Sequence, residues 1–388
     1  MYNLTINMQS LVEKINFFLS QTWFWLTISV LFASAVMFFD FSVLGLYQDK
    51  NDTKGYMDLI TYFDDGIIPT QTAELLMFNI RLLKPFYGLM GSILTPFFEP
   101  YSAMLMLNLL LYFGTVLLLF HLLTKYLKFS GLMGFFGVAW FACSYPMLKY
   151  GFSLMTDISG YFFIILTVYL AIIGFNKDRY AYFLAAGIAA GIGVTAKESG
   201  AFGLLFILVY SIFELKNISF FKTIKRLLAV GAPFILIFFS TNYIVYNLIN
   251  YSYVDFLTMV EDEYAANFRT WKFFLGTQIA TFNLLWIPFF YGLYRINTYA
   301  HKKLLLSLIA AGLPALLWSV YIVRGLFVQY IFIIPIALFG ITYFFTKDRL
   351  GTWMPKPLKF TLVSLPCLLS IGLFLISRGS SIWKIFGI

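Results

Sequence analysis

Residues 101–124 read YSAMLMLNLLLYFGTVLLLFHLLT and contain no Asp, Glu, Lys or Arg. The hydrocarbon core of a bilayer is about 30 Å thick, and a helix needs about 20 consecutive apolar residues to cross it. This stretch is therefore predicted to be a transmembrane helix. Similar apolar runs occupy residues 23–39, 131–148, 158–175, 181–196, 200–213, 227–249, 275–292, 304–323, 326–345 and 360–377. The sequence thus predicts an all-α, polytopic membrane helix bundle with about 10–12 transmembrane helices.

The composition agrees with a chain that is solvated by lipid. Hydrophobic residues make up 61% and charged residues 12% of the 388 residues, and the mean hydropathy is +0.83. A soluble globular chain has about 45–50% apolar and about 25% charged residues. The two cysteines, Cys143 and Cys367, lie in apolar runs, and His121 and His301 lie far apart. These residues support neither a disulfide framework nor a zinc site, and they make a His-based metal site improbable. We therefore expect no cofactor, while a requirement for a divalent metal is not indicated and stays open.

The first apolar run admits two interpretations. Its Ala33-Ser34-Ala35 stretch has the small residues of a signal-peptidase site. The run nevertheless continues apolar to Phe39, which favours a retained membrane anchor.

The distribution of charge predicts an orientation. With the N-terminus in the cytoplasm, 16 of the 27 Lys and Arg residues fall on cytoplasmic segments, as the positive-inside rule requires. On this assignment 14 of the 18 carboxylates face the outside or lie at the outer membrane boundary. The net charge of +9 is scattered between apolar runs and is explained by topology rather than by nucleic-acid binding. We expect a multi-pass protein, in a bacterial inner or plasma membrane, with an acid-rich outer face.

Two outer segments, residues 40–100 and 250–274, are long enough to be more than turns, and no separate soluble domain is visible. We therefore treat 1–388 as a single membrane-embedded domain. Within the first segment, apolar residues at positions i, i+3, i+4 and i+7 predict an amphipathic helix that ends near Gly66. These residues are Tyr56, Leu59, Ile60 and Phe63. A second amphipathic helix follows and is broken at Lys84-Pro85; both are too short to span and are expected to lie on the membrane.

Charged residues at the outer ends of spans are candidates for function, because a charge at the centre of a membrane helix costs about 2.5–3.5 kcal/mol. With the acids of the first outer segment, they would converge on one cavity at the outer leaflet if the helices bundle in order. The alternative for each is an interfacial charge that extends to water. The residues are Asp40, Asp49, Asp52, Asp157, Lys197, Glu198 and Arg324.

Five short segments carry a resemblance to a known family by their order and placement. They are Asp52-Thr53-Lys54-Gly55-Tyr56, Arg81-Leu82-Leu83-Lys84-Pro85-Phe86-Tyr87, Thr156-Asp157, Thr195-Ala196-Lys197-Glu198-Ser199 and Gln329-Tyr330-Ile331-Phe332-Ile333-Ile334-Pro335. Together they resemble motifs of the GT-C superfamily of integral membrane glycosyltransferases, the class of the protein O-mannosyltransferases and the aminoarabinose transferases of lipid A. The resemblance covers about residues 20–345.

Individually, the segments are similar to the family's D-x-x-x-Y, (R/K)PP-x-Y, T-(D/E), TR-P-E and RY-x-x-P-x-x-P patterns. The second has only one of the two prolines, and the fourth has Lys197 for the usual Arg and no proline. In the fifth, Gln329 stands where Arg is usual, which removes a cation from a place where such enzymes meet lipid phosphate. Arg324, five residues earlier, is the candidate to replace it.

The resemblance implies a glycosyltransferase that takes a sugar from a polyprenyl-phosphate donor and transfers it to a lipid, glycan or protein acceptor at the outer face, with inversion. Asp52 is then the candidate base, Asp49 a second candidate, and Asp157 would orient the acceptor or Asp52. The residues expected to bind the donor are Lys197, Glu198, Arg324, Tyr56, Arg81, Lys84, Gln329 and Tyr330.

Two other functions remain open from the sequence. A transporter or flippase of a lipid-linked or polar substrate would also carry charges in the membrane, but its internal repeats are not visible here. A non-catalytic membrane subunit could keep the fold and lack activity. The sequence does not reveal the sugar, the acceptor, the length of the carrier or the assembly of the protein into a complex.

Overall fold

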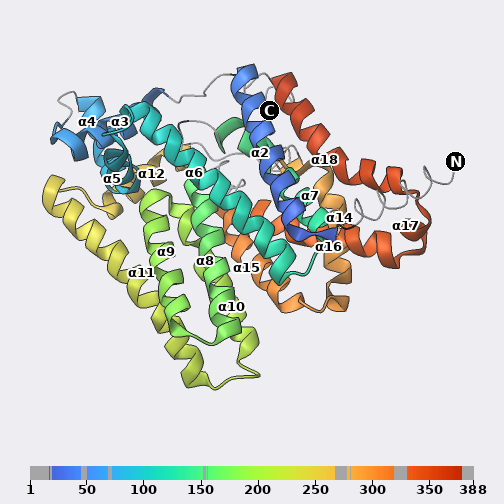
Figure 1. Ribbon diagram of the computed structural model, residues 1–388. Coiled ribbons are helices and arrows are strands. Elements are labelled where there is room, and N and C mark those ends of the chain that lie inside the picture. The colour runs from blue at the N-terminus through green and yellow to red at the C-terminus, as the bar shows by residue number, and fades with distance from the viewer. Residues whose placement is uncertain are drawn as a thin grey trace.

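A computed structural model describes residues 17, 20–44, 50–68, 72–151, 154, 156–266, 278–279, 281–318 and 330–377. Throughout these residues the regular structure is helical (Figure 1). The helices that build the bundle are α2 (Thr22–Leu44), α6 (Pro100–His121), α7 (Gly131–Ala142), α8 (Asp157–Lys177), α9 (Tyr180–Ala196), α10 (Gly203–Glu214), α11 (Phe220–Ile249), α12 (Tyr253–Ala266), α14 (Trp286–Arg295), α15 (Lys302–Trp318), α16 (Tyr330–Lys347) and α18 (Lys356–Ser377). The other helices and short turns are α3 (Lys50–Asp65), α4 (Thr72–Leu82), α5 (Phe86–Leu94), η1 (Leu122–Tyr126), η2 (Met147–Gly151), η3 (Glu198–Phe202), η4 (Asn283–Leu285), η5 (Ile296–Thr298) and α17 (Arg349–Trp353).

Among the described residues, five helices are long and apolar enough to cross a membrane, and three shorter apolar helices accompany them. The five are Thr22–Ser42, Pro100–Tyr126, Asp157–Lys177, Phe220–Ile249 and Lys356–Ile376, and the three are Gly131–Ala142, Tyr180–Ala196 and Phe332–Lys347. Each coincides with a predicted apolar run. The runs at 200–213, 275–292 and 304–323 fall on η3 with α10, on α14 and on α15, with parts of the last two outside the described residues. The polytopic all-α membrane fold is therefore confirmed.

Two helices begin or end at residues other than the limits of their apolar runs. The run at 227–249 belongs to α11, which has 30 residues because Ser219 caps it: the Ser219 Oγ accepts a hydrogen bond from the Lys222 amide at 3.3 Å. The polar first turns of this helix were not part of the apolar run. The run at 131–148 ends as an α-helix at Ala142, before the bend at Cys143.

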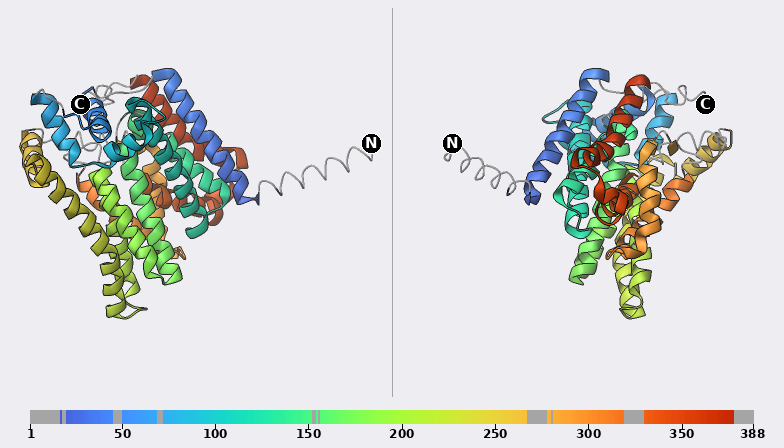
Figure 2. Two further views of the ribbon diagram at one scale, coloured as in Figure 1. Left: turned by 60° about the vertical axis from the view of Figure 1, so that its left-hand side comes forward. Right: turned by 90° about the vertical axis from the view of Figure 1, so that its right-hand side faces the viewer.

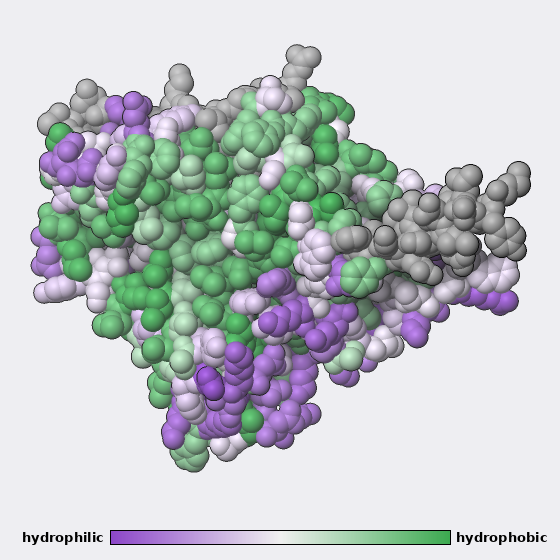
Figure 3. Space-filling model, in the orientation of Figure 1, coloured by the Kyte–Doolittle hydropathy of each residue, from purple (hydrophilic) through white to green (hydrophobic). Residues whose placement is uncertain are grey.

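The surface is apolar where lipid is expected. Large apolar side chains such as Phe38, Leu236 and Ile287 are about two-thirds exposed on the outside of the bundle. Figure 3 shows hydrophobic residues over the middle of this face and hydrophilic residues gathered at its lower end. The first helix, α2, packs into the bundle, where Ala33 is buried and its carbonyl accepts a hydrogen bond from the Tyr112 hydroxyl at 3.3 Å.

The segment between α2 and α6 forms three helices, α3, α4 and α5, at one end of the bundle (Figures 1 and 2). The predicted apolar face of α3 is buried at Tyr56, Leu59 and Ile60, and the helix ends at Asp65 before Gly66, whose φ is +74°. Its contacts are with the protein: Leu59 packs with residues of α4 and with Val245 of α11. The predicted break at Lys84-Pro85 is present, and Pro85 is the N-cap residue of the additional helix α5.

Candidate functional site

The first turn of α3 is held against the segment that precedes α8. The Thr53 hydroxyl donates a hydrogen bond to the Leu154 carbonyl at 3.3 Å, and the Tyr56 hydroxyl lies 3.3 Å from the Thr156 Oγ1. Two motifs that are 100 residues apart in the sequence are thereby joined. The backbone of Asp52 lies in this first turn, directly before Thr53. The side chain of Asp52 and the whole of Asp49 lie outside the described residues.

Asp157 begins α8 and is buried, with 6% of its surface exposed. A carboxylate at a helix N-terminus is stabilised by the helix dipole. The Asp157 Oδ1 lies 3.4 Å from the Lys197 Nζ. The Oδ2 is also buried, and within the part of the chain that the structure describes it has no hydrogen-bond partner. The Oδ1 of this carboxylate is thus paired with a cation, and the Oδ2 can accept a hydrogen bond.

The turn between α9 and η3 presents Lys197 and Glu198 to the neighbouring helices. The turn is tight because a Cβ on Gly200 would lie 2.5 Å from the backbone carbon of Gly193, closer than real Cβ atoms come. Against α8, a Cβ on Gly160 would lie 2.3 Å from the Ser199 Oγ. Small residues at these close approaches therefore fix the two charged side chains beside Asp157.

Glu198 forms an ion pair with Lys84, which lies in the bend between α4 and α5. Both side chains are largely buried, with 16% and 6% of their surfaces exposed. Burial lowers the pKa of Lys84 to about 8, although the carboxylate of Glu198 acts in the opposite direction. Burial raises the pKa of Glu198, but the ammonium groups of Lys84 and Lys197 outweigh it and bring this pKa to about 2. Both groups are therefore charged at neutral pH.

Aromatic side chains surround these charges. The Arg81 Cζ lies 4.9 Å from the centroid of the Tyr56 ring, and the Lys84 Nζ lies 4.7 Å from that of Phe256 on α12. The Tyr56 and Tyr87 rings are 5.5 Å apart, and Tyr87 donates a hydrogen bond to Asn108 at 2.7 Å. Such contacts between cations and rings strengthen when they are removed from water.

Six residues singled out from the sequence are thus brought into one connected cluster at one end of the bundle. They are Tyr56, Arg81, Lys84, Asp157, Lys197 and Glu198. Sequence reasoning missed Thr53, Tyr87, Asn108 and Phe256. Thr53 and Tyr87 stand inside motifs and could have been noticed, whereas the sequence has no signal that links Phe256 to Lys84.

The remaining predicted residues are not joined to this cluster by any contact that the described residues show. Arg324 and Gln329 lie outside the described part of the chain, as does the side chain of Tyr330, whose backbone begins α16. Asp40 is buried near the end of α2, and its Oδ1 has no hydrogen-bond partner among the described residues. Within the same residues, no group of three or more His, Cys, Asp or Glu side chains could hold a metal ion.

Comparison with known proteins relates the fold to one superfamily. Residues 92–245, less than half of the chain, match the family model described as dolichyl-phosphate-mannose-protein mannosyltransferase. The structure is similar to that of ArnT from Cupriavidus metallidurans bound to undecaprenyl phosphate, with a TM-score of 0.58 and 14% sequence identity over 93% of this chain and 73% of that one. It is also similar to the arabinosyltransferase EmbB from Mycobacterium smegmatis, with a TM-score of 0.53 and 11% identity over 92% of this chain and 38% of that one. No curated protein matches the sequence. The chain therefore has the fold of the GT-C superfamily of integral membrane glycosyltransferases.

Proposed function

We propose that this protein is an inverting membrane glycosyltransferase that moves a sugar from a polyprenyl-phosphate donor to an acceptor hydroxyl at the outer face of the membrane. The observation that carries the proposal is the buried charge cluster of Asp157, Lys197, Glu198 and Lys84 beside the first turn of α3. The undecaprenyl phosphate bound to the structurally similar ArnT supports a lipid phosphate as the donor's carrier.

The reaction requires a base and a site for a leaving phosphate. In an inverting transfer, the bond between the anomeric carbon and the phosphate oxygen breaks, and its electron pair stays on the phosphate. The acceptor oxygen bonds to the opposite face of the anomeric carbon, while its proton passes to a carboxylate. The leaving phosphate gains one negative charge, which a preorganised cation stabilises.

The cluster offers residues for both needs. Lys84 and Lys197 are cations held in place by Glu198 and Asp157, so little reorganisation is needed when the phosphate departs. Arg324 is a further candidate for phosphate binding. The unpartnered Oδ2 of Asp157 can accept a hydrogen bond from the acceptor and so orient it. We assign the role of base to Asp52; its neighbour Thr53 is hydrogen-bonded to Leu154 and Tyr56 lies against Thr156, the residue before Asp157, which supports this choice.

The proposed orientation puts this cluster outside and the N-terminus in the cytoplasm. At the end of the bundle away from the cluster, Asp178, between α8 and α9, pairs with Lys222 and Arg226 of α11. The many further basic residues of this end support its assignment to the cytoplasm by the positive-inside rule.

The test of the proposal is the pair of variants Asp52→Asn and Asp49→Asn. Asn has nearly the same size as Asp and can still accept a hydrogen bond, but it cannot act as a base, so it separates a structural role from a catalytic one. In a transfer assay with radiolabelled polyprenyl-phosphate sugars, Asp52→Asn should lose about a hundredfold or more in turnover. Its thermal stability and donor binding should be unchanged.

Asp49→Asn is the internal control and should have a milder effect. If Asp49→Asn abolishes turnover and Asp52→Asn does not, the base lies three residues upstream and the proposed function stands. If the wild type is active and neither variant loses activity, the first outer segment does not supply the base and the proposed mechanism is wrong.

A further inference from the structure

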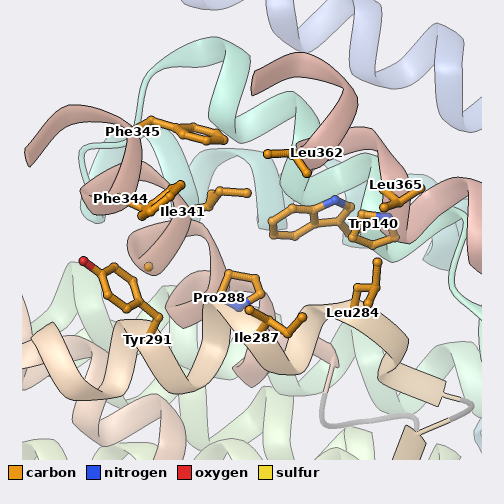
Figure 4. A pocket seen from close by; sticks show the side chains of 12 residues that line it. Trp140, Leu284, Ile287, Pro288, Tyr291, Ile341, Phe344, Phe345, Leu362 and Leu365 are labelled. Atoms are coloured by element: carbon orange, nitrogen blue, oxygen red, sulfur yellow. The ribbon is translucent and has the colours of Figure 1, made fainter. Parts of the chain in front are cut away.

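A second site of interest is an apolar cavity of about 290 Å³ between α7, α14, α16 and α18. Figure 4 shows side chains from all four helices around it. Its walls include Trp140, Ile287, Pro288, Phe344, Phe345 and Leu362. This volume is close to the lower limit, about 300 Å³, of pockets that bind small ligands. None of these residues belongs to the cluster described above.

The cavity communicates with the lipid-facing surface. Ile287 and Leu362 line it, yet 68% and 36% of their surfaces are exposed on the outside of the bundle. An opening on this surface meets hydrocarbon chains rather than water, since the surrounding exterior is apolar. The walls are therefore suited to an alkyl chain that enters sideways from the bilayer.

Cations lie at one end of the cavity, on the aromatic residues that line it. The Arg295 Cζ is 5.7 Å from the centroid of the Tyr291 ring, and the Tyr291 hydroxyl donates a hydrogen bond to Asp348. The Lys359 Nζ donates a hydrogen bond to the Phe345 carbonyl at 3.3 Å and lies 5.5 Å from the Phe345 ring centroid. Two cations and one carboxylate leave this end with a net positive charge.

This cationic end is at the opposite end of the bundle from the catalytic cluster. Arg295 ends α14, and Tyr299, four residues later, donates a hydrogen bond to the Leu127 carbonyl. Leu127 follows α6 and η1, whereas α6 begins at Pro100 beside α5. With 22 residues, α6 is about 33 Å long, enough to cross a bilayer core, so these two ends lie on opposite sides of the bundle.

We propose that the cavity binds one acyl chain of an anionic phospholipid from the leaflet opposite the catalytic cluster, with its phosphate held by Arg295 and Lys359. An apolar ligand alone would not explain the cations at one end of the cavity. A soluble anion would not explain the apolar walls. Basic pockets between transmembrane helices are suited to anionic head groups in this way. The bound chain fills the space between α14 and α18 and thereby stabilises their packing.

Native mass spectrometry of the full-length protein in detergent tests the proposal, with phosphatidylglycerol and phosphatidylcholine of identical acyl chains as probes. The wild type should bind phosphatidylglycerol about tenfold or more tightly than phosphatidylcholine, because the anionic head group gains charge-assisted contacts. Arg295→Gln and Lys359→Gln should each reduce this preference.

The cavity itself is tested by Leu362→Trp, which fills it. Its control is Leu369→Trp, seven residues later on the same face of α18. Leu369 is 38% exposed and does not line the cavity. Leu362→Trp should lose most phosphatidylglycerol binding, and Leu369→Trp should bind it normally. An undecaprenyl phosphate probe should bind both variants as it binds the wild type, which also shows that they are folded.

Three results would overturn the inference. Normal phosphatidylglycerol binding in Leu362→Trp would remove the cavity as the site. An unchanged preference for phosphatidylglycerol in both cation variants would mean that the phosphate is held elsewhere. If Leu362→Trp abolishes binding of undecaprenyl phosphate and leaves phosphatidylglycerol binding intact, the cavity serves the carrier lipid instead. The first two results do not bear on the transfer activity proposed above, which depends on the other end of the bundle, whereas the third would move the carrier lipid of that reaction to the cavity.

Discussion

The pH dependence of donor binding should report the protonation of Lys84. Its pKa of about 8, lowered by burial from the ordinary 10.5, lies within an accessible pH range. About nine-tenths of Lys84 side chains are then charged at pH 7, about half at pH 8 and about a tenth at pH 9. If the ammonium group binds the donor phosphate, affinity for a polyprenyl phosphate should fall roughly tenfold between pH 7 and pH 9.

Two substitutions should change this fall in affinity at alkaline pH, the alkaline limb of the binding profile, in different ways. Lys84→Arg keeps the cation at all these pH values, because the guanidinium does not deprotonate, so the limb should disappear. Glu198→Gln removes the carboxylate that favours the charged form of Lys84. A charge-assisted hydrogen bond contributes about 1.5–3 kcal/mol, and one pH unit corresponds to 1.36 kcal/mol. The limb of Glu198→Gln should therefore move about one to two pH units lower, so that its affinity is already below that of the wild type at pH 7.

Folding stability should respond in the opposite direction, which excludes unfolding as the cause of the limb. Between pH 8 and 10.5 the unfolded chain binds the Lys84 proton more tightly than the folded protein does. Stability rises with pH wherever the unfolded state holds more protons, so this group stabilises the folded protein as pH rises through that range.

The measurement is the affinity for undecaprenyl phosphate from pH 7 to pH 9, with the melting temperature recorded in parallel. A phosphate monoester loses its second proton near pH 6, so the charge of the probe is nearly constant across this range. Lys216→Arg, an exposed site on the other side of the bundle, is the matched control and should keep the wild-type limb. A limb that persists unchanged in Lys84→Arg would refute the assignment of the phosphate contact to this residue.

Three further predictions follow from the same structure. A cysteine at exposed Asp65 should react with a membrane-impermeant maleimide in intact cells; labelling from the cytoplasmic side alone would contradict the orientation. Lys197→Ala and Arg324→Ala should each weaken donor binding about ten- to a hundredfold in a folded protein, since a charge-assisted contact is lost; unchanged affinity and turnover in both would favour charges that merely extend to water. Gly200→Ala should lower stability by about 1–3 kcal/mol in thermal unfolding, because the added Cβ meets backbone, and should impair activity. Gly231→Ala, where no atom lies within 4 Å of the new Cβ, should be neutral or stabilising, and equal effects of the two would contradict the tight turn.

Hydrophobic runs were sufficient to predict the fold class, because a bilayer admits helical spans and excludes most other structures. The amphipathic pattern of Tyr56, Leu59 and Ile60 likewise predicted a helix, and all three side chains are buried. What the pattern could not give is the surface that this face packs against. It was expected to lie on the membrane, and the structure packs Leu59 with Val245, a contact between residues far apart in the sequence.

The charge cluster was only partly predictable. The motifs identified Asp157, Lys197, Glu198 and Lys84 as candidates, but they could not indicate that Glu198 pairs with Lys84 and Asp157 with Lys197. The pairing depends on the turn made possible by Gly193 and Gly200. The apolar cavity had no sequence signal at all, because its lining residues are indistinguishable from lipid-facing ones in a hydropathy profile.

The pairing of Lys84 with Glu198 also has a consequence for how the chain is made. The partners are separated by 114 residues (198 − 84), and synthesis proceeds at about 5–20 residues per second. For about 6–23 s, then, the bend between α4 and α5 has emerged without the carboxylate that will neutralise it. During this interval the apolar faces of α3 and α4 have no α11 to pack on, so the nascent loop must rest on lipid or on an insertion factor. Although α3 and α4 are translated early, they are thus among the last elements to reach their final positions.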